Sequence, residues 1–502
     1  MSNFKKKIGD ALGSDRFSST ALTAFFLAVI VTLNVVLYII VEFFGLYFYS
    51  IEKADLTLSG STDSLFASSI EENKKVKISF CLAEEDLESH TTGNYVYQTA
   101  KYFEERYPGF IEVDYINLIT RRNKNNELVE LSKYKTDMLG NETPIFKSSV
   151  IFECGENYRV VSDTYTSAGF APFYTLDASN NMTSYNGEEV VASMISWVLK
   201  DEHKKAYFTQ FHGETAELAF SNLLACAGYY VDVIDLRKKE VPADADLLVI
   251  SNPTSDFEAA REGSGLRTEI DRLKTYVERG GNIYVSLDPY VKSMTVLESF
   301  LAENGIKFSV TETESGTKIR NMIKDDRNAI TTDGFTLVTE FAGNETAKKI
   351  SDRVAGYSDG RVIVREASAL ELSGNAKPLL TSSSASVLEA GGATVSRGGS
   401  YAVAAYSENG DAKIFVVPSV YITASDSLIT SGYSNKDFLY SLFQDFFGAG
   451  EMPYGCKAVL YNTQVLENLT MGTAKLYTAL IMLVPVALAA TGAVIIVRRK
   501  NR

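Results

Sequence analysis

Residues 205–289 read KAYFTQFHGETAELAFSNLLACAGYYVDVIDLRKKEVPADADLLVISNPTSDFEAAREGSGLRTEIDRLKTYVERGGNIYVSLDP and alternate between strand-like and helix-like segments. Short apolar runs typical of strands lie at 206–209, 231–236, 246–253 and 283–289. Between them, two segments place apolar residues at helical spacing and end at glycines. Strands that alternate with helices predict a parallel sheet covered by helices on both faces.

Polar residues lie at the carboxyl ends of three of these predicted strands. They are His212, Glu214, Asn252 and Asp288. Ligands of open α/β sheets usually bind at the carboxyl ends of the strands. The four residues are therefore the candidate ligand-binding residues of this chain.

His212 and Glu214 form the most enzyme-like pair in the sequence. General-base catalysis needs a nucleophile within hydrogen-bond reach of the base. The sequence has no Gly-x-Ser-x-Gly elbow, and Cys226 lies in an apolar helical segment that is typical of a core. We therefore expect Gly213 to permit a tight turn, and the two side chains to bond to the backbone or cap the next helix. No catalytic residue is predicted, and a hydrolase that uses this pair remains the alternative.

Asp288 precedes Pro289 and a predicted helix at 291–304. An aspartate before a proline commonly caps a following helix, and this is the favoured interpretation. The alternative is that Asp288 binds a ligand or a cation at the strand end.

The composition excludes several classes of function. The 502 residues predict about two to four domains. A net charge of −14 argues against a nucleic-acid partner. The four widely spaced cysteines and three histidines predict no metal site, and no cofactor is expected. The chain has no nucleotide-binding P-loop, so another chain must hydrolyse nucleotide if the process consumes it.

Both ends of the chain carry long apolar runs. They predict transmembrane helices at 21–44 and 476–497, each long enough to cross a bilayer. Basic residues in the short ends, 1–20 and 498–502, place both termini in the cytoplasm by the positive-inside rule. The remainder of the chain is then expected outside the cytoplasmic membrane, with the lipid bilayer as one partner.

The region between the two membrane helices divides by pattern into three parts. A polar connector is expected at 50–75 and a small α/β domain at 76–165. The main α/β domain is expected at 185–450, with a β-rich insertion at about 306–400. Strand 413–417 and a phenylalanine-rich helix near 438–447 are expected to extend the sheet that begins at residue 206.

Several segments, in order, resemble GldG-type accessory proteins of ABC transporters. The resemblance begins with Asp55-Leu56-Thr57 after the first membrane helix and continues with the Gly-Glu-Glu at 187–189. The 206–214 strand and turn are similar to a block that ends in Gly-His-Gly-Glu, with Phe211 in place of its first glycine. Segments 247–253 and 273–289, and a closing region with Asn435, are also similar.

The resemblance implies both a fold and a setting. The implied fold is an extracytoplasmic, flavodoxin-like domain similar to class I glutamine amidotransferases without their cysteine, plus a smaller α/β domain, with two flanking membrane helices. The implied partners are an ABC permease and its ATPase. We therefore expect a non-catalytic accessory subunit whose outer domain binds a substrate, a partner or an envelope component. A hydrolase or amidase and a passive envelope scaffold remain the alternatives.

Overall fold

The computed structural model describes residues 58, 61–89, 93–137, 142–162, 173–176, 182–214, 218–260, 266–314, 316–430 and 432–460. The predicted membrane helices at 21–44 and 476–497 and the predicted cytoplasmic ends lie outside these residues. Among the helices of the described part, none is both long and apolar enough to cross a membrane.

The central sheet confirms the parallel α/β architecture expected from residues 205–289. In the described residues it has ten strands, in the order β12-β19-β23-β24-β11-β10-β8-β9, with β20 paired to β23 and β17 to β20. Five neighbours are parallel, namely β8 (Lys204–Thr209), β9 (Tyr229–Ile234), β10 (Leu247–Ser251), β11 (Asn282–Ser286) and β24 (Ala412–Val417). Numbered by sequence, their spatial order is 2-1-3-4-5, one of the two common orders of doubly wound sheets.

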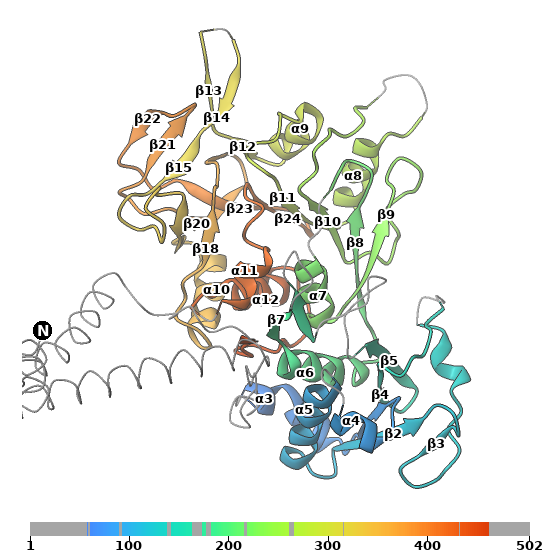
Figure 1. Ribbon diagram of the computed structural model, residues 1–502. Coiled ribbons are helices and arrows are strands. Elements are labelled where there is room, and N and C mark those ends of the chain that lie inside the picture. The colour runs from blue at the N-terminus through green and yellow to red at the C-terminus, as the bar shows by residue number, and fades with distance from the viewer. Residues whose placement is uncertain are drawn as a thin grey trace, which may run out of the picture. The chain divides into compact units, whose positions relative to one another are not determined.

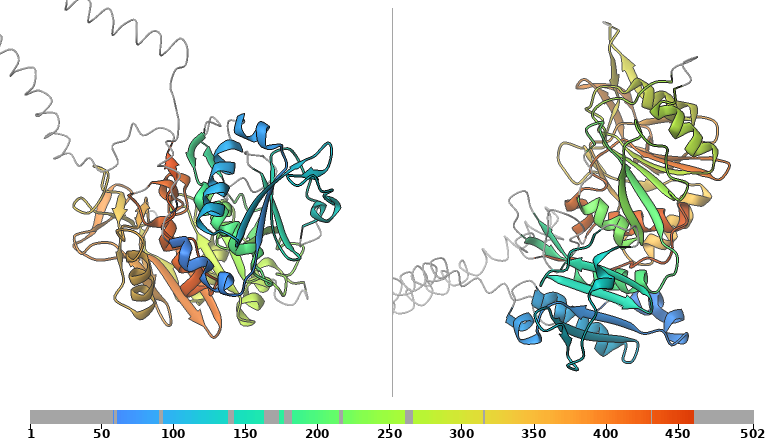
Figure 2. Two further views of the ribbon diagram at one scale, coloured as in Figure 1. Left: turned by 90° about the horizontal axis from the view of Figure 1, so that it is seen from below. Right: turned by 90° about the vertical axis from the view of Figure 1, so that its right-hand side faces the viewer.

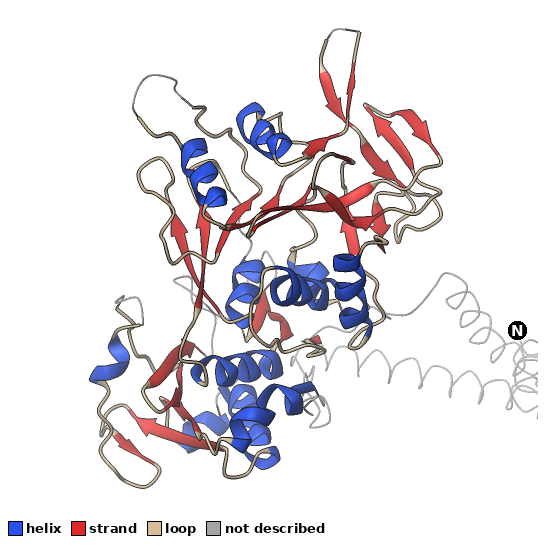
Figure 3. Ribbon diagram, turned by 180° about the vertical axis from the view of Figure 1, so that it is seen from behind, coloured by secondary structure: helices blue, strands red, loops and turns tan. Residues whose placement is uncertain are grey.

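Helices cover both faces of this sheet (Figure 3). On one face, α8 (Glu269–Glu278) and α9 (Thr295–Glu303) pack Ile270, Leu273 and Leu297 into one core with the sheet. On the other face, α7 (Leu218–Cys226) presents Phe220, whose ring lies 4.9 Å from that of Tyr284 in β11. Leu266 precedes α8 and is exposed, so the buried apolar stripe of this helix begins at Ile270.

The C-terminal part of the described chain completes the second face. Helix α11 (Ser425–Ile429) is followed by α12 (Asn435–Ser441), which continues as a π-helical turn over Leu442–Phe446. The expected phenylalanine-rich stripe is buried, and Phe438 packs near Phe415 of β24. The chain then reaches β25 (Val459–Leu460), which pairs with β7 (Met182–Tyr185), the neighbour of β6 (Tyr174–Leu176).

Short strands and one helix make up residues 306–400. The helix is α10 (Glu345–Ala355), capped by the Asn344 side chain. The strands are β12 (Ile306–Phe308), β13 (Val310–Glu312), β14 (Lys318–Arg320), β15 (Met322–Lys324), β16 (Thr336–Val338), β17 (Glu340–Phe341), β18 (Ile363–Arg365), β19 (Leu370–Leu372), β20 (Lys377–Thr381), β21 (Val387–Ala390) and β22 (Ala393–Arg397). Of these, β12, β17, β19 and β20 belong to the central sheet, as does the following β23 (Ala402–Asn409). The β13–β14 hairpin extends away from its neighbours in two views (Figures 1 and 2).

The N-terminal part of the described chain forms a separate five-stranded sheet, in the order β3-β2-β1-β4-β5. Its strands are β1 (Val76–Phe80), β2 (Ile111–Asn117), β3 (Arg122–Asn123), β4 (Ser149–Cys154) and β5 (Asn157–Ser162). Its helices are α3 (Ser61–Glu71), α4 (Glu84–Ser89), α5 (Gly93–Arg106) and a short 3-10 helix at Ser132–Lys135. Helix α3 lies within the segment that was predicted to be a polar connector. Its Phe66 is fully buried against aromatic rings of this domain, so this part of the connector packs on the domain.

Helix α6 (Gly187–Val198) connects the two sheets. It contacts α5 and β4 of the N-terminal sheet and α7 of the main domain. All but one of its residues are buried, which explains why its sequence is apolar on almost every side.

Candidate functional site

The carboxyl ends of β8 and β10 lie where the strand order reverses, which is the usual ligand position in doubly wound sheets. In this chain the two turns that follow these strands are bonded to each other. The backbone amides of Thr254 and Ser255 donate to the His212 carbonyl at 2.8 and 2.9 Å. The chain itself therefore joins the two sides of the position where a ligand would enter.

His212 lies at the centre of a buried charged cluster. Its Nδ1 atom is 2.9 Å from Glu214 Oε1, and its Nε2 atom is 3.0 Å from Glu269 Oε2. The imidazole also stacks on Phe257, with ring centroids 4.0 Å apart. The side chains of His212, Glu214 and Glu269 are each at most 5% exposed.

The two carboxylates determine the charge of the imidazole. Burial alone would lower the pKa of His212, but the hydrogen bonds to Glu214 and Glu269 outweigh burial and raise the pKa to about 9. Burial would likewise raise the pKa of Glu214, but the hydrogen bond from His212, backbone hydrogen bonds and the charge of His212 together outweigh burial and lower this pKa. At neutral pH the cluster therefore holds an imidazolium between two carboxylates.

This arrangement is unsuited to general-base catalysis. A base must offer a free lone pair to the proton that it removes. Both ring nitrogens of His212 are instead engaged by carboxylates, and the ring is protonated. The expected structural role is confirmed for Glu214, whose Oε2 also accepts from the backbone amide of His212 at 2.7 Å.

Sequence reasoning missed Glu269, the partner of His212 on α8. Glu269 follows the helix cap Thr268, and its Oε2 also accepts from the backbone amide of Glu258 at 2.9 Å. A glutamate in the first turn of a helix is commonly exposed, where it interacts with the helix dipole. Nothing local distinguishes this buried glutamate from an exposed one, because its partner lies 57 positions earlier in the chain.

Asn252 and Asp288 form their hydrogen bonds outside the His212 cluster. Asn252 has left-handed backbone geometry, with φ of 51°, and its backbone N–H donates to the Ser286 carbonyl. Its buried Oδ1 has no hydrogen-bond partner among the described residues. Asp288 accepts from the backbone amide of Tyr290 and so caps a turn, whereas the expected helix begins only at Thr295.

The predicted capping role of Asp288 on that helix is therefore wrong. The carboxylate of Asp256 takes this role, since it accepts from the amides of Val296 and Leu297 at 2.9 and 3.1 Å.

Phe211 occupies an unfavourable backbone conformation beside His212. Its φ of 83° is left-handed, a conformation that costs a bulky residue about 1–2 kcal/mol and suits glycine. Its side chain is 55% exposed. The Arg237 guanidinium lies 4.2 Å from the ring centroid, and the Lys238 amine lies 5.6 Å from it.

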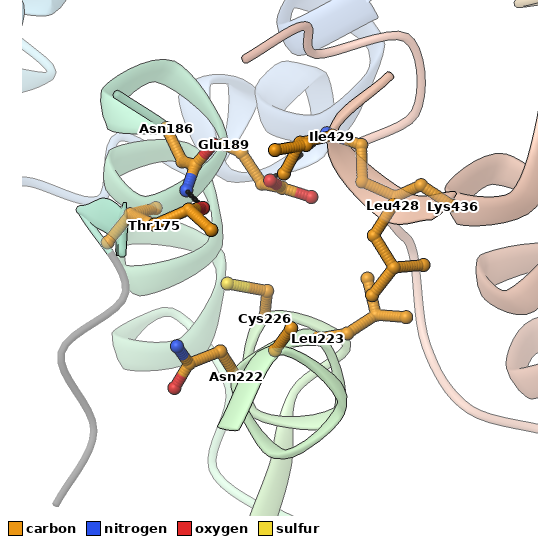
Figure 4. A pocket seen from close by; sticks show the side chains of 11 residues that line it. Thr175, Asn186, Glu189, Asn222, Leu223, Cys226, Leu428, Ile429 and Lys436 are labelled. Carbon is orange, nitrogen blue, oxygen red and sulfur yellow. Dashed lines mark hydrogen bonds and ion pairs between the residues drawn. The ribbon is translucent and has the colours of Figure 1, made fainter. Parts of the chain in front are cut away.

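A second polar cluster lines a pocket between α6, α7, α11 and α12 (Figure 4). The pocket has about 440 Å³ of empty space, open solvent included. Lys436 Nζ lies 3.1 Å from Glu189 Oε2, and Tyr440 donates to Glu189 Oε1 at 2.5 Å. Burial alone would lower the pKa of Lys436, but nearby groups, with Glu189 the largest contributor, together outweigh burial and raise it.

Two further side chains give this pocket mixed polarity. The Oδ1 of Asn222 is buried without a hydrogen-bond partner in the described part of the chain. Burial raises the pKa of the Cys226 thiol to about 12, so the thiol is protonated at neutral pH and is a poor nucleophile. The described residues contain no group of three or more histidine, cysteine, aspartate or glutamate side chains that could hold a metal ion.

Glu189 and Asn435 belong to the segments on which the family resemblance rests, and both have structural partners. Glu189 binds Lys436, which also donates to the Cys456 carbonyl at 2.5 Å. The fully buried Asn435 side chain accepts from the Ile363 amide and donates to the Ile363 carbonyl, at 2.9 and 2.8 Å. These two residues therefore fix α12 to α6 and to β18.

No family model matches this chain, and no curated protein matches it. Among solved structures, an IFT52 N-terminal domain aligns with 50% of this chain and 99% of its own, at 15% identity and a TM-score of 0.36. A ThuA-like protein of Bacteroides uniformis aligns over 49% and 94%, at 13% identity and a TM-score of 0.30. A glutamine amidotransferase of Thermotoga maritima aligns over 49% and 100%, at 13% identity and a TM-score of 0.28.

Proposed function

We propose that this chain is a non-catalytic accessory subunit of an ABC-type transport complex. In this proposal two membrane helices, at 21–44 and 476–497, anchor a flavodoxin-like, amidotransferase-like outer domain that binds a substrate, a partner or an envelope component. The partners are a permease and an ATPase, and no nucleic acid is bound. The ordered resemblance to GldG-type proteins supports this setting.

The observation that carries the proposal is that both ring nitrogens of His212 are bonded to carboxylates. The sheet has the strand order of many enzymes, yet its histidine at the strand end is protonated and bonded to two carboxylates. The turns on either side are also bonded to each other. A strand-end histidine fixed in this way supports binding rather than turnover.

Co-purification tests the accessory role. The full chain, tagged at its C-terminus and extracted in mild detergent from its native cells, is expected to bring down a permease and a P-loop ATPase in a constant ratio. An unrelated two-pass membrane protein with the same tag, expressed at the same level, is the control. Repeated absence of both partners would refute the accessory role.

The alternative is an extracytoplasmic hydrolase or amidase that uses His212 and Glu214. Their position after β8 motivates it. On the accessory model, purified chain hydrolyses neither ester nor amide substrates above background. Hydrolysis that disappears in both His212→Gln and Glu214→Gln, with folding retained by circular dichroism, would establish the alternative.

A passive scaffold is disfavoured by the pocket between α6 and α12. A passive scaffold predicts no concave pocket, whereas residues of α6, α7, α11 and α12 line one here. The accessory role also predicts that deletion of the chain changes ATP turnover by the complex, whereas loss of a scaffold leaves turnover per complex unchanged.

A further inference from the structure

The ring of Phe211 is exposed at the point where the strand order reverses. A bulky residue with left-handed backbone geometry is uncommon, and such residues gather at functional sites. Burial does not compensate for this strain, because 55% of the side chain remains exposed. Phe211 therefore combines an unfavourable backbone conformation with an exposed apolar ring. A glycine at this position would have neither.

Two basic side chains lie against this ring, on a strongly acidic chain. Arg237 and Lys238 lie near the ring face, and Lys239 extends the run. Asp235 pairs with the first two at 2.9 and 3.3 Å. Three cations accompany one carboxylate over 235–239, whereas the whole chain carries a net charge of −14.

The position of this patch suits a segment of chain better than a small molecule. The turns after β8 and β10 are bonded to each other, so the usual ligand position is bridged. The Phe211 ring and the neighbouring cations remain exposed to solvent. The side chain of Lys238 is 72% exposed, and that of Arg237 is 44% exposed.

We propose that Phe211, Arg237, Lys238 and Lys239 form a docking surface for an acidic segment of a partner protein that also carries aromatic side chains. Carboxylates of the segment pair with the cations, and its rings pack on Phe211. Charge complementarity favours this occupant, because an acidic chain that presents a local basic patch attracts an acidic partner there. The inference rests on the proposed accessory function and names its contact surface.

Fluorescence anisotropy with a defined peptide tests the surface. The probe is a fluorescein-labelled peptide of about ten residues built from Glu-Glu-Phe repeats, titrated with the full chain in detergent. Binding is expected to weaken as salt increases. Phe211→Gly is expected to weaken it by about tenfold or more, and so is the joint change of Arg237, Lys238 and Lys239 to Gln.

Matched controls separate the patch from general charge. Lys307, Lys318 and Lys348 are exposed in the described structure, and their joint change to Gln removes the same charge. Binding by that variant is expected to stay within about twofold of the unmodified chain. Peptides with Lys in place of Glu, or Ala in place of Phe, are expected to bind at least about tenfold more weakly.

A stability measurement excludes a merely structural role for Phe211. Glycine relieves the left-handed strain, so the urea midpoint of Phe211→Gly is expected to stay the same or rise while peptide binding is lost. A lowered midpoint with unchanged binding would show that the ring only supports the fold.

Several results would overturn the proposal. They are no peptide binding up to about 1 mM at low salt, equal binding by Phe211→Gly, patch-dependent binding to phosphatidylglycerol vesicles but not to the peptide, and patch-dependent self-association in light scattering. Successful co-purification of permease and ATPase alongside any of these results would leave the accessory function standing and refute this surface alone.

Discussion

The Nε2 atom of His212 lies 3.0 Å from the Oε2 atom of Glu269, across 57 positions of sequence. This contact joins the turn after β8 to the first turn of α8. Together with Glu214 it keeps the imidazole protonated in a buried site.

The stability of the protein should decrease at alkaline pH through His212. The pKa of His212 is raised from its ordinary 6.5 to about 9 in the folded state. Its contribution is therefore fully present below about pH 6.5 and is lost as the pH rises through about 9, by up to about 3 kcal/mol. Urea unfolding at a series of pH values, compared between the unmodified chain and His212→Gln, measures the difference. A constant difference between the two chains across this range would contradict the assignment.

Glu269→Gln should lower the pKa of His212. Removal of one carboxylate leaves burial opposed by Glu214 alone, so we expect a decrease of about one unit or more. Histidine-selective NMR titration is practical because the chain has only three histidines. Glu278→Gln, at the exposed opposite end of the same helix, is the control and should leave the pKa unchanged. Equal titration curves for all three chains would show that Glu269 does not set the charge.

Gly213→Ala should destabilise the turn after β8. The φ of 74° is left-handed, and an added Cβ would lie 2.1 Å from Thr254 Oγ1. We expect a loss of more than about 2 kcal/mol in the free energy of unfolding. Gly410→Ala, with φ of 62° and open space around its Cβ, should lose only about 1 kcal/mol. The additional change Thr254→Ala should recover part of the larger loss, and a failure to do so would place the strain elsewhere.

Lys436→Met should destabilise the contact between α6 and α12. The change leaves the Glu189 carboxylate buried without its cation, which typically costs about 3–5 kcal/mol. The double variant Glu189→Gln with Lys436→Met removes both charges and should recover a large part of that loss. Urea unfolding of the single and double variants gives the coupling free energy. Additive losses would mean that the two side chains do not act as a pair.

The local pattern of the chain was sufficient for the main sheet. Strand and helix periodicities around residues 206–289 predicted the parallel strands β8 to β11, and the apolar run at 413–417 was correctly expected to join them as β24. The insertion was harder to predict. Many of its strands are only two or three residues long, so they show little periodicity, and some pair with strands far away in sequence. Helix α10 gave no signal that we recognised.

The candidate site could be predicted only in part. The sequence placed His212 beside Glu214, because residues two positions apart in a turn interact locally. It could not place Glu269 at the second ring nitrogen or Lys436 against Glu189, since these partners meet only through folding. It also gave Asp288 the wrong partner, because the start of a helix depends on which side chain reaches its free amides, and here Asp256 does.

The sequence by itself determined the alternation of strands and helices, the acidic charge and the turn that Gly213 permits, because each depends on neighbouring residues. The tertiary structure alone decided which of the polar residues are free to act. It buried His212 between two carboxylates and left Phe211 exposed among cations, although the two are adjacent in the chain. Burial and charge pairing arise from contacts between distant segments, so the state of these two residues depends on the fold and not on local sequence.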